Sequence, residues 1–362
     1  MEYRRLGKTS LNVSEIAIGT EHLGRCSQKA IDSVLRHSVD RGFNYFDILT
    51  GAEKQREKFG HAIKDIRDKI FIGGHFYSKT RIPVESKKLF ESLLKRLKTD
   101  YVDVLFIQFV DKENDYNNII NNGLYELAHQ YKENGVTRYV GISGHKSDIG
   151  IKAAKSGLFD VIMHPINLAT SAISTPFRRG FTQDDNRDEL LLSCKQNNVG
   201  LIAIKPFWGG KLLKPNRSYT ATPEQCIHYC LSQIGVNVVL AGIESIKKVD
   251  ILLDYYNASA KEKDFSSILS VQSRDENIVK DCVYCNHCLP CPQHIDIALI
   301  NKIHDEAGFY LTKRLKNDYL TIVPNASDCV ECGDCVSRCP FNVDVILKMK
   351  QTVAMFNEKK KW

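Results

Sequence analysis

The chain has 362 residues, which is more than one average domain and enough for two. Hydrophobic residues make up 43% and charged residues 26%, which excludes a disordered chain and a coiled coil. The basic residues behind the net charge of +7 are dispersed, and no basic stripe interleaved with aromatic residues predicts nucleic-acid binding. No apolar run could span a bilayer and the first residues lack a signal-peptide core, so we expect a cytoplasmic protein without a membrane partner.

Short apolar runs alternate with longer amphipathic segments over residues 1–257. Segment 84–98 is typical of the amphipathic kind, because its leucines recur at helical spacing. Eight strands that alternate with helices imply parallel pairing through right-handed crossovers and fit an α/β fold, a (β/α)8 TIM barrel. A doubly wound sheet is the alternative, but no Gly-x-Gly-x-x-Gly turn follows the first strand. The predicted strands are 14–19, 43–47, 69–74, 101–107, 138–143, 159–163, 200–205 and 237–242.

Three further segments complete the predicted domain organisation. The polar segment 168–183 has no periodicity, which is typical of a lid or binding loop. Residues 258–278 are mixed and charged, and we interpret them as a linker or connecting helix. A cysteine-rich domain then occupies 279–345, and 346–362 is predicted to form a C-terminal helix with a basic tail.

Eight of the twelve cysteines lie between Cys282 and Cys339. Such crowding in a reducing compartment indicates metal ligation and not a disulfide framework. The first run has the spacing C-x2-C-x2-C-x2-C-P, and the second has C-x2-C-x2-C-x3-C-P, which is the run of bacterial two-cluster ferredoxins. Zinc is the alternative, but zinc sites use pairs of C-x2-C knuckles and not four cysteines in each run.

The proline after each fourth cysteine turns the chain away, so that this cysteine ligates the other cluster. The pattern therefore predicts an α-helical domain of the bacterial ferredoxin type with two [4Fe–4S] clusters. The first run is one residue short before its last cysteine, which makes the crosswise assignment less direct there. One predicted ligand set is Cys282, Cys285, Cys288 and Cys339, and the other is Cys329, Cys332, Cys335 and Cys291.

Several stretches of the predicted barrel resemble one family, and they occur in the right order. They are 3–20, 43–47, 57–64, 100–108, 139–145, 159–167, 202–212 and 237–250. On these stretches the chain resembles the aldo-keto reductases, and with the cysteine tail it resembles their iron-sulfur branch. The resemblance implies an oxidoreductase that acts on a small-molecule substrate with NADP(H).

The resemblance implies a catalytic set that this sequence keeps only in part. The family reduces carbonyls with an Asp, a Tyr proton donor, a Lys that lowers the pKa of that Tyr, and a His. The Asp matches Asp47, but the Tyr falls on Ala52, the Lys on His75 and the His on Gln108. Since Ala52 cannot protonate a developing alkoxide, ordinary carbonyl reduction is not expected. We interpret Asp47 as an orienting or acid/base carboxylate, His75 as the proton donor, with Tyr77 as another candidate, and Gln108 as a hydrogen-bond donor.

The cofactor pocket implied by the resemblance is also kept in part. A Gln expected in the sixth strand falls on Met163, and a Tyr expected before Asn167 falls on Ile166. Glycines and lysines after the last two strands suit the phosphate site of a barrel. The positions assigned to cofactor binding are Ser143, Asn167, Lys205, Gly210, Lys211, Gly242, Ser245 and Lys248.

Histidines and carboxylates follow several predicted strands at the end where barrels have their active sites. These side chains would suit a divalent metal or a proton relay, and the alternative is that each packs by itself. They are His22, His75, His145 and His164, with Glu21, Asp47 and Glu244.

NADPH delivers two electrons at once and a cluster accepts one, so a flavin would be the usual converter, although no motif indicates one. We predict an iron-sulfur oxidoreductase from an anaerobic setting that couples the two clusters to redox chemistry in the barrel. Two alternatives stay open. One is an electron-transfer protein with an inactive barrel and a redox protein partner, and the other is a metal-dependent enzyme that uses the mouth histidines.

Overall fold

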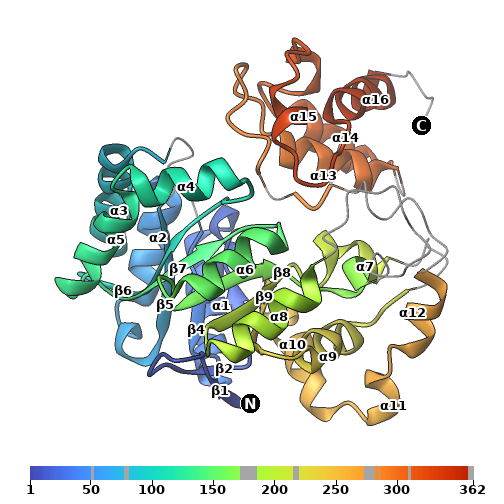
Figure 1. Cartoon of the computed structure of the whole chain (residues 1–362). Helices are drawn as coiled ribbons and strands as arrows, with labels where there is room; N and C mark the ends of the chain where they lie inside the picture. The colour runs from blue at the N-terminus through green and yellow to red at the C-terminus, as the bar shows by residue number, and fades with distance from the viewer. Residues whose placement is uncertain are drawn as a thin grey trace. The chain divides into compact units, whose positions relative to one another are not determined.

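The computed structural model describes residues 1–49, 53–76, 81–171, 186–214, 220–272, 282–284, 286–308 and 311–357 (Figure 1). The chain divides into two compact units, Met1–Arg274 and Asp275–Trp362, and the division lies within the predicted linker 258–278. No helix in the described part of the chain is long and apolar enough to cross a membrane.

Eight parallel strands close into a barrel in the first unit, in the order β10-β3-β4-β5-β6-β7-β8-β9. Each strand coincides with one of the eight predicted apolar runs, so the predicted (β/α)8 barrel is confirmed and the doubly wound sheet is excluded. An antiparallel hairpin of β1 (Tyr3–Arg5) and β2 (Asn12–Ser14) precedes the barrel. The barrel strands are β3 (Ile16–Gly19), β4 (Tyr45–Asp47), β5 (Phe71–Phe76), β6 (Val102–Ile107), β7 (Thr137–Ser143), β8 (Val161–Pro165), β9 (Gly200–Ile204) and β10 (Val236–Gly242).

The helices of the first unit follow the amphipathic segments of the sequence. In α3 (Pro83–Leu97), for example, Phe90, Leu93 and Leu97 are buried on one face. Of the predicted lid 168–183, the first four residues form α7 (Leu168–Ser171), and 172–183 lie outside the described residues. The others are α1 (Gln28–Asp40), α2 (Glu53–Ile63), α4 (Glu113–Asn121), α5 (Leu124–Glu133), α6 (Ser147–Ser156), α8 (Arg187–Gln196), α9 (Pro223–Ser232), α10 (Ile246–Asn257), α11 (Ala260–Lys263) and α12 (Ser266–Gln272).

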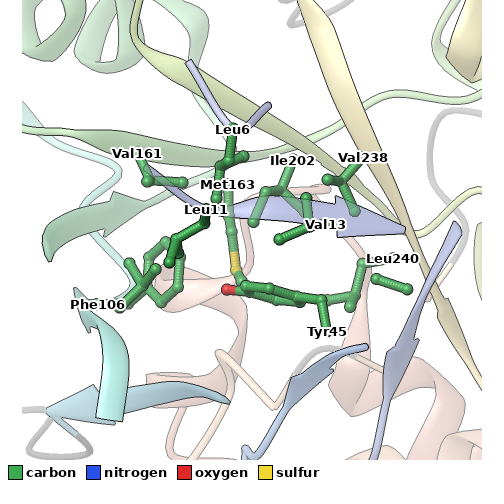
Figure 2. Close-up of a cluster of buried hydrophobic side chains, with 12 residues drawn as sticks. Leu6, Leu11, Val13, Tyr45, Phe106, Val161, Met163, Ile202, Val238 and Leu240 are labelled. Atoms are coloured by element: carbon green, nitrogen blue, oxygen red, sulfur yellow. The ribbon is translucent and has the colours of Figure 1, made fainter. Parts of the chain in front are cut away.

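The interior of the barrel is filled with apolar side chains from the strands and from the hairpin (Figure 2). Leu6 of the hairpin segment packs so closely on Gly200, the first residue of β9, that a Cβ at Gly200 would lie 2.8 Å from the leucine Cγ. The hairpin segment therefore closes the N-terminal end of the barrel, and the C-terminal ends of the strands remain for a site.

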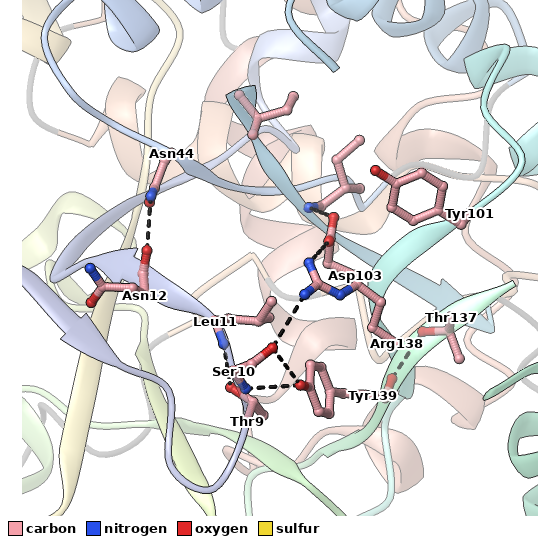
Figure 3. Close-up of polar contacts among 12 residues, drawn as sticks. Thr9, Ser10, Leu11, Asn12, Asn44, Tyr101, Asp103, Thr137, Arg138 and Tyr139 are labelled. Carbon is pink, nitrogen blue, oxygen red and sulfur yellow. Dashed lines mark hydrogen bonds and ion pairs between the residues drawn. The ribbon is translucent and has the colours of Figure 1, made fainter. Parts of the chain in front are cut away.

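A buried carboxylate near the start of β6 ties neighbouring strands together (Figure 3). Asp103 is 1% exposed and accepts hydrogen bonds from the Ile72 N–H at 2.9 Å and from Arg67 and Arg138, both at 3.1 Å. Arg138 also donates to the hydroxyl oxygen of Ser10 at 3.2 Å, which links β7 to the hairpin. Since two cations and an amide surround this carboxylate, it is fully compensated within the fold.

The Asp103→Ala variant is expected to lose about 3 kcal/mol of stability, because two arginines and a buried amide lose their shared acceptor. Urea unfolding would measure the loss as a shift in midpoint. Asp100→Ala is the matched control, since Asp100 is exposed and precedes the same strand. Its effect should stay within about 0.5 kcal/mol, and equal losses in the two variants would contradict the role of the network.

The second unit is helical, with α13 (Ile297–Ala307), α14 (Lys313–Leu320), α15 (Asp334–Arg338) and α16 (Val345–Asn357). Its core contains isoleucines of α13, Tyr319 of α14, Cys335 of α15 and Phe356 of α16, and five other cysteines pack against it. The rings of Tyr319 and Phe356 stack with centroids 4.3 Å apart. The predicted C-terminal helix is therefore α16 and is part of this core, while 358–362 lie outside the described residues.

Candidate functional site

The three predicted catalytic residues lie at the C-terminal ends of adjacent strands. Asp47 ends β4, His75 is the penultimate residue of β5, and Gln108 directly follows β6. All three are buried, with exposed fractions of 5%, 5% and 3%. His75 Nε2 lies 2.8 Å from Asp47 Oδ1, so Asp47 and His75 form a hydrogen-bonded pair. The imidazole also stacks on Phe106 of β6 with centroids 5.3 Å apart, which fixes the plane of the ring.

Buried polar atoms without a partner mark this end of the barrel. Within the described residues, His75 Nδ1 and both amide atoms of Gln108 are buried and form no hydrogen bond. Leaving a buried polar atom without a hydrogen bond costs about 1–3 kcal/mol of folding free energy. Such an atom is expected where a bound ligand supplies the missing hydrogen bond. Since Asp47 engages Nε2, Nδ1 is the imidazole nitrogen that remains for a substrate.

The side chains of Asp47 and Tyr45 pack closely over Gly73 of β5, where a larger residue would not fit. A Cβ at Gly73 would lie 2.8 Å from Asp47 Oδ1 and 2.7 Å from the hydroxyl of Tyr45. Burial, and then the nearby Asp47 carboxylate, hold the pKa of Tyr45 well above its usual value, so its hydroxyl stays protonated. Sequence reasoning did not single out Tyr45, although alternation along β4 places it on the same face as Asp47.

Two positions of the sequence-based interpretation cannot be placed beside this pair. Ala52, where the resemblance puts the tyrosine, and Tyr77, the other candidate donor, both lie outside the described residues.

The predicted cofactor positions also come to the C-terminal ends of strands. Ser143 ends β7, Gly242 ends β10, and the completely buried Asn167 follows β8. After β9, the backbone of Lys205 is left-handed with φ of 57°. Gly210 lies in the short helix η4 (Trp208–Leu213) with φ of 82° and leaves an open surface, and Lys211 beside it is buried.

Two of the predicted phosphate-binding residues are already bonded to other residues of the chain. The hydroxyl of Ser245 accepts the Lys248 N–H and caps the N-terminus of α10. The ammonium of Lys248 pairs with the carboxylate of Glu244. An anion at this place would therefore compete with Glu244 for Lys248, and this competition was not foreseen from the sequence.

The histidines at the barrel mouth have separate partners. His145 Nδ1 lies 3.3 Å from Asp111, and His164 Nε2 lies 3.4 Å from the Ser147 hydroxyl, while His75 pairs with Asp47. Among the described residues of the first unit, no three His, Cys, Asp or Glu ligand atoms converge. The divalent-metal site at the mouth stays a prediction.

A cavity in the second unit joins the two cysteine runs. It is lined by Cys291 of the first run and by Cys329, Cys332 and Cys335 of the second, and Cys288 also borders it. Cys339 is not among its lining residues. The lining thus contains the full crosswise ligand set and lacks the fourth cysteine of the second run.

A hydrogen bond joins the two runs beside their last cysteines. The guanidinium of Arg338, which precedes Cys339, donates to the carbonyl of Pro290, which precedes Cys291, at 2.7 Å. The residues that directly precede the fourth cysteines of the two runs are therefore in contact.

The spacing of the described thiols bears on whether a cluster or zinc would fit. Cys285 lies outside the described residues, and no three sulfurs of the described cysteines lie within 4.8 Å of one another. A tetrahedral zinc ion with Zn–S bonds of about 2.3 Å would hold its sulfurs about 3.8 Å apart. In an iron-sulfur cube each thiolate binds a different iron atom, so the sulfurs stay further apart. The donor set therefore fits a cube better than zinc.

The model of the family described as "Aldo/keto reductase family" matches residues 15–225, which is more than half of the chain. The chain belongs to the aldo/keto reductase family. The match ends before the cysteine-rich unit, so the family assignment concerns the barrel.

Individual relatives agree with this assignment. The uncharacterized oxidoreductase YqkF of Bacillus subtilis (strain 168) is 25% identical over 287 residues, which cover 69% of this chain and 89% of that protein. L-galactose dehydrogenase of Arabidopsis thaliana is 24% identical over 290 residues, with 69% and 86% covered. The solved structure of aldo-keto reductase AKR11C1 from Bacillus halodurans, in its holo form, superposes with a TM-score of 0.59 at 21% identity and covers 76% of this chain and 97% of that one. This aldo/keto reductase is thus an oxidoreductase with the barrel of its family.

Proposed function

We propose that this aldo/keto reductase is an iron-sulfur oxidoreductase whose second unit holds two [4Fe–4S] clusters. The observation that carries the proposal is the cavity lined by Cys288 and Cys291 of the first run and by Cys329, Cys332 and Cys335 of the second, because it brings cysteines of both runs together. Cys282, Cys285, Cys288 and Cys339 would hold the second cluster. When bound, the clusters supply one-electron transfer for redox chemistry in the barrel.

In the barrel, we propose that His75 donates a proton from Nδ1 to a small-molecule substrate. Asp47 accepts the hydrogen bond from Nε2 and holds the ring in place. The amide of Gln108 donates a hydrogen bond to the same substrate. Burial of these groups strengthens their interaction with a charge that develops on the substrate. This set replaces the tyrosine, lysine and histidine of the family, so the chemistry proposed is not ordinary carbonyl reduction.

NADP(H) is the proposed cofactor of the barrel, since members of this family commonly use it. Ser143, Asn167 and Lys205 lie at strand ends where the cofactor would bind, and Gly210 and Lys211 would face its phosphates. The Glu244–Lys248 ion pair competes for such a phosphate. A flavin or a redox protein partner would then connect the two-electron and one-electron steps.

The experiment that tests the proposal is metal and sulfide analysis of protein purified without oxygen. Two cubes predict about eight iron atoms and eight acid-labile sulfides in each chain. Visible absorption should bleach with dithionite. Bleaching with NADPH would place nicotinamide in the electron path, and a direct NADPH titration would follow if it failed. Stoichiometric zinc without iron would overturn the proposal.

A further inference from the structure

One polar side chain interrupts the apolar face that α13 presents to the core of the second unit. The buried residues of this helix are Ile297, Ala298, Ile300, Asn301, Ile303 and Ala307, and Asn301 is the one polar residue among them. Its side chain is 0% exposed. A buried amide in an apolar environment is costly unless its hydrogen bonds are made, so its presence calls for a partner that justifies it.

The amide of Asn301 makes one such bond, and its partner is a cysteine sulfur. Asn301 Nδ2 donates to Cys282 Sγ at 3.3 Å. Asn301 Oδ1, in contrast, is buried without a partner among the described residues. Only the nitrogen of the amide therefore has a hydrogen-bond partner. The N–H to sulfur bond is the one polar interaction that offsets the cost of burying this side chain.

A second donor reaches a sulfur of the same proposed cluster. The backbone N–H of Val343 donates to Cys339 Sγ at 3.4 Å. In the crosswise assignment Cys282 and Cys339 are ligands of one cube. Hydrogen bonds to ligand sulfurs are one of the means by which a protein sets a cluster potential.

We propose that Asn301 is a positioning residue that raises the reduction potential of the cluster held by Cys282, Cys285, Cys288 and Cys339. The inference rests on the proposed function, since it requires the clusters. Reduction adds one electron and one negative charge to the cluster, and no bond forms or breaks at Asn301. An N–H aimed at a ligand sulfur stabilises the more negative, reduced form, so its loss disfavours reduction.

The test uses the full chain, purified without oxygen, in a potentiometric titration with dithionite followed by electron paramagnetic resonance. Asn301→Leu removes the donor at nearly constant volume. The reduced-to-oxidised ratio of one cluster should fall roughly tenfold at a given potential, a shift of about 59 mV for a one-electron couple. The other cluster should keep its potential. Asn301→Asp, which places a carboxylate beside the sulfur, should shift the same cluster further in the same direction.

The matched control is Ile300→Val, which loosens packing at an adjacent, fully buried position of α13 and removes no hydrogen-bond donor. It should leave both potentials unchanged. Full iron content with unchanged potentials in both Asn301 variants would overturn the inference and leave the proposed function intact. Iron loss from both variants would also overturn it, because the amide would then serve assembly and not the potential. Absence of clusters from the unsubstituted protein would overturn the proposed function itself.

Discussion

The His75→Ala variant is expected to lose about 10²–10⁴-fold in kcat, the usual contribution of a positioned acid. The imidazole is held by Asp47 at 2.8 Å and by stacking on Phe106, so its Nδ1 is fixed before a substrate arrives. The loss should appear mainly in kcat, because a proton donor acts most strongly on the transition state. The assay is anaerobic turnover of whichever substrate the unsubstituted protein accepts from a panel of carbonyl and other acceptors.

Two further variants test whether the loss of turnover comes from the loss of a proton donor. Asp47→Asn keeps the shape of the carboxyl group but removes its charge, so it should impair turnover less than loss of the imidazole. His129→Gln is the control, because His129 lies on α5 and its partner is the exposed Glu133. Unchanged turnover in His75→Ala would contradict the assignment of His75 as donor, whatever the effect of the other two variants.

The barrel could be predicted because its signals are local. Each strand is a short apolar run, and the following helix carries its own amphipathic pattern, so pairing in chain order reproduces the observed closed sheet. The resemblance to the aldo-keto reductases then implied that Asp47, His75 and Gln108 lie at strand ends. The alternation could not predict the hydrogen-bond partner of each side chain, because that partner depends on the direction in which the side chain points across the barrel.

Particular residues show this difference. His75 pairs with Asp47, as two residues on neighbouring strands can. His145 pairs with Asp111 and His164 with Ser147, so histidines that share one end of the barrel do not share one ligand. Ser245 resembles a phosphate ligand in the sequence, yet its hydroxyl caps its own helix. The sequence therefore predicts that such a histidine or serine lies at the C-terminal end of the barrel, but it does not predict which group the side chain binds.

The cysteine runs differ, because their motif alone predicts which cysteines should share a cluster. The proline after each fourth cysteine predicted that Cys291 would join the cysteines of the other run. The cavity is lined by Cys288 and Cys291 together with Cys329, Cys332 and Cys335, and the ligand set itself stays a prediction. Asn301, in contrast, carries no motif. Its contact with Cys282 arises from a helix packed on the run, so only the folded chain reveals it.

Removing the iron is expected to unfold the second unit and leave the barrel folded. Metal or cluster binding contributes directly to folding where the ligands lie within the core, and here Cys335 belongs to that core while five other cysteines pack against it. A small helical unit has few other contacts to replace them. The core of the barrel interior contains no cysteine, so it should not respond.

Hydrogen exchange measured by mass spectrometry would check this outcome on the full chain before and after treatment with an oxidant and a chelator. Amides of α13 and α16 should lose most of their protection, whereas those of β6 and β7 should keep theirs. Chelator without oxidant is the control, because it removes loosely bound metal and leaves an intact cube in place. Protection of α13 and α16 after complete iron loss would contradict the prediction. The apolar contacts around Tyr319 and Phe356 would then suffice to fold the unit, and the cysteines would not contribute to its stability.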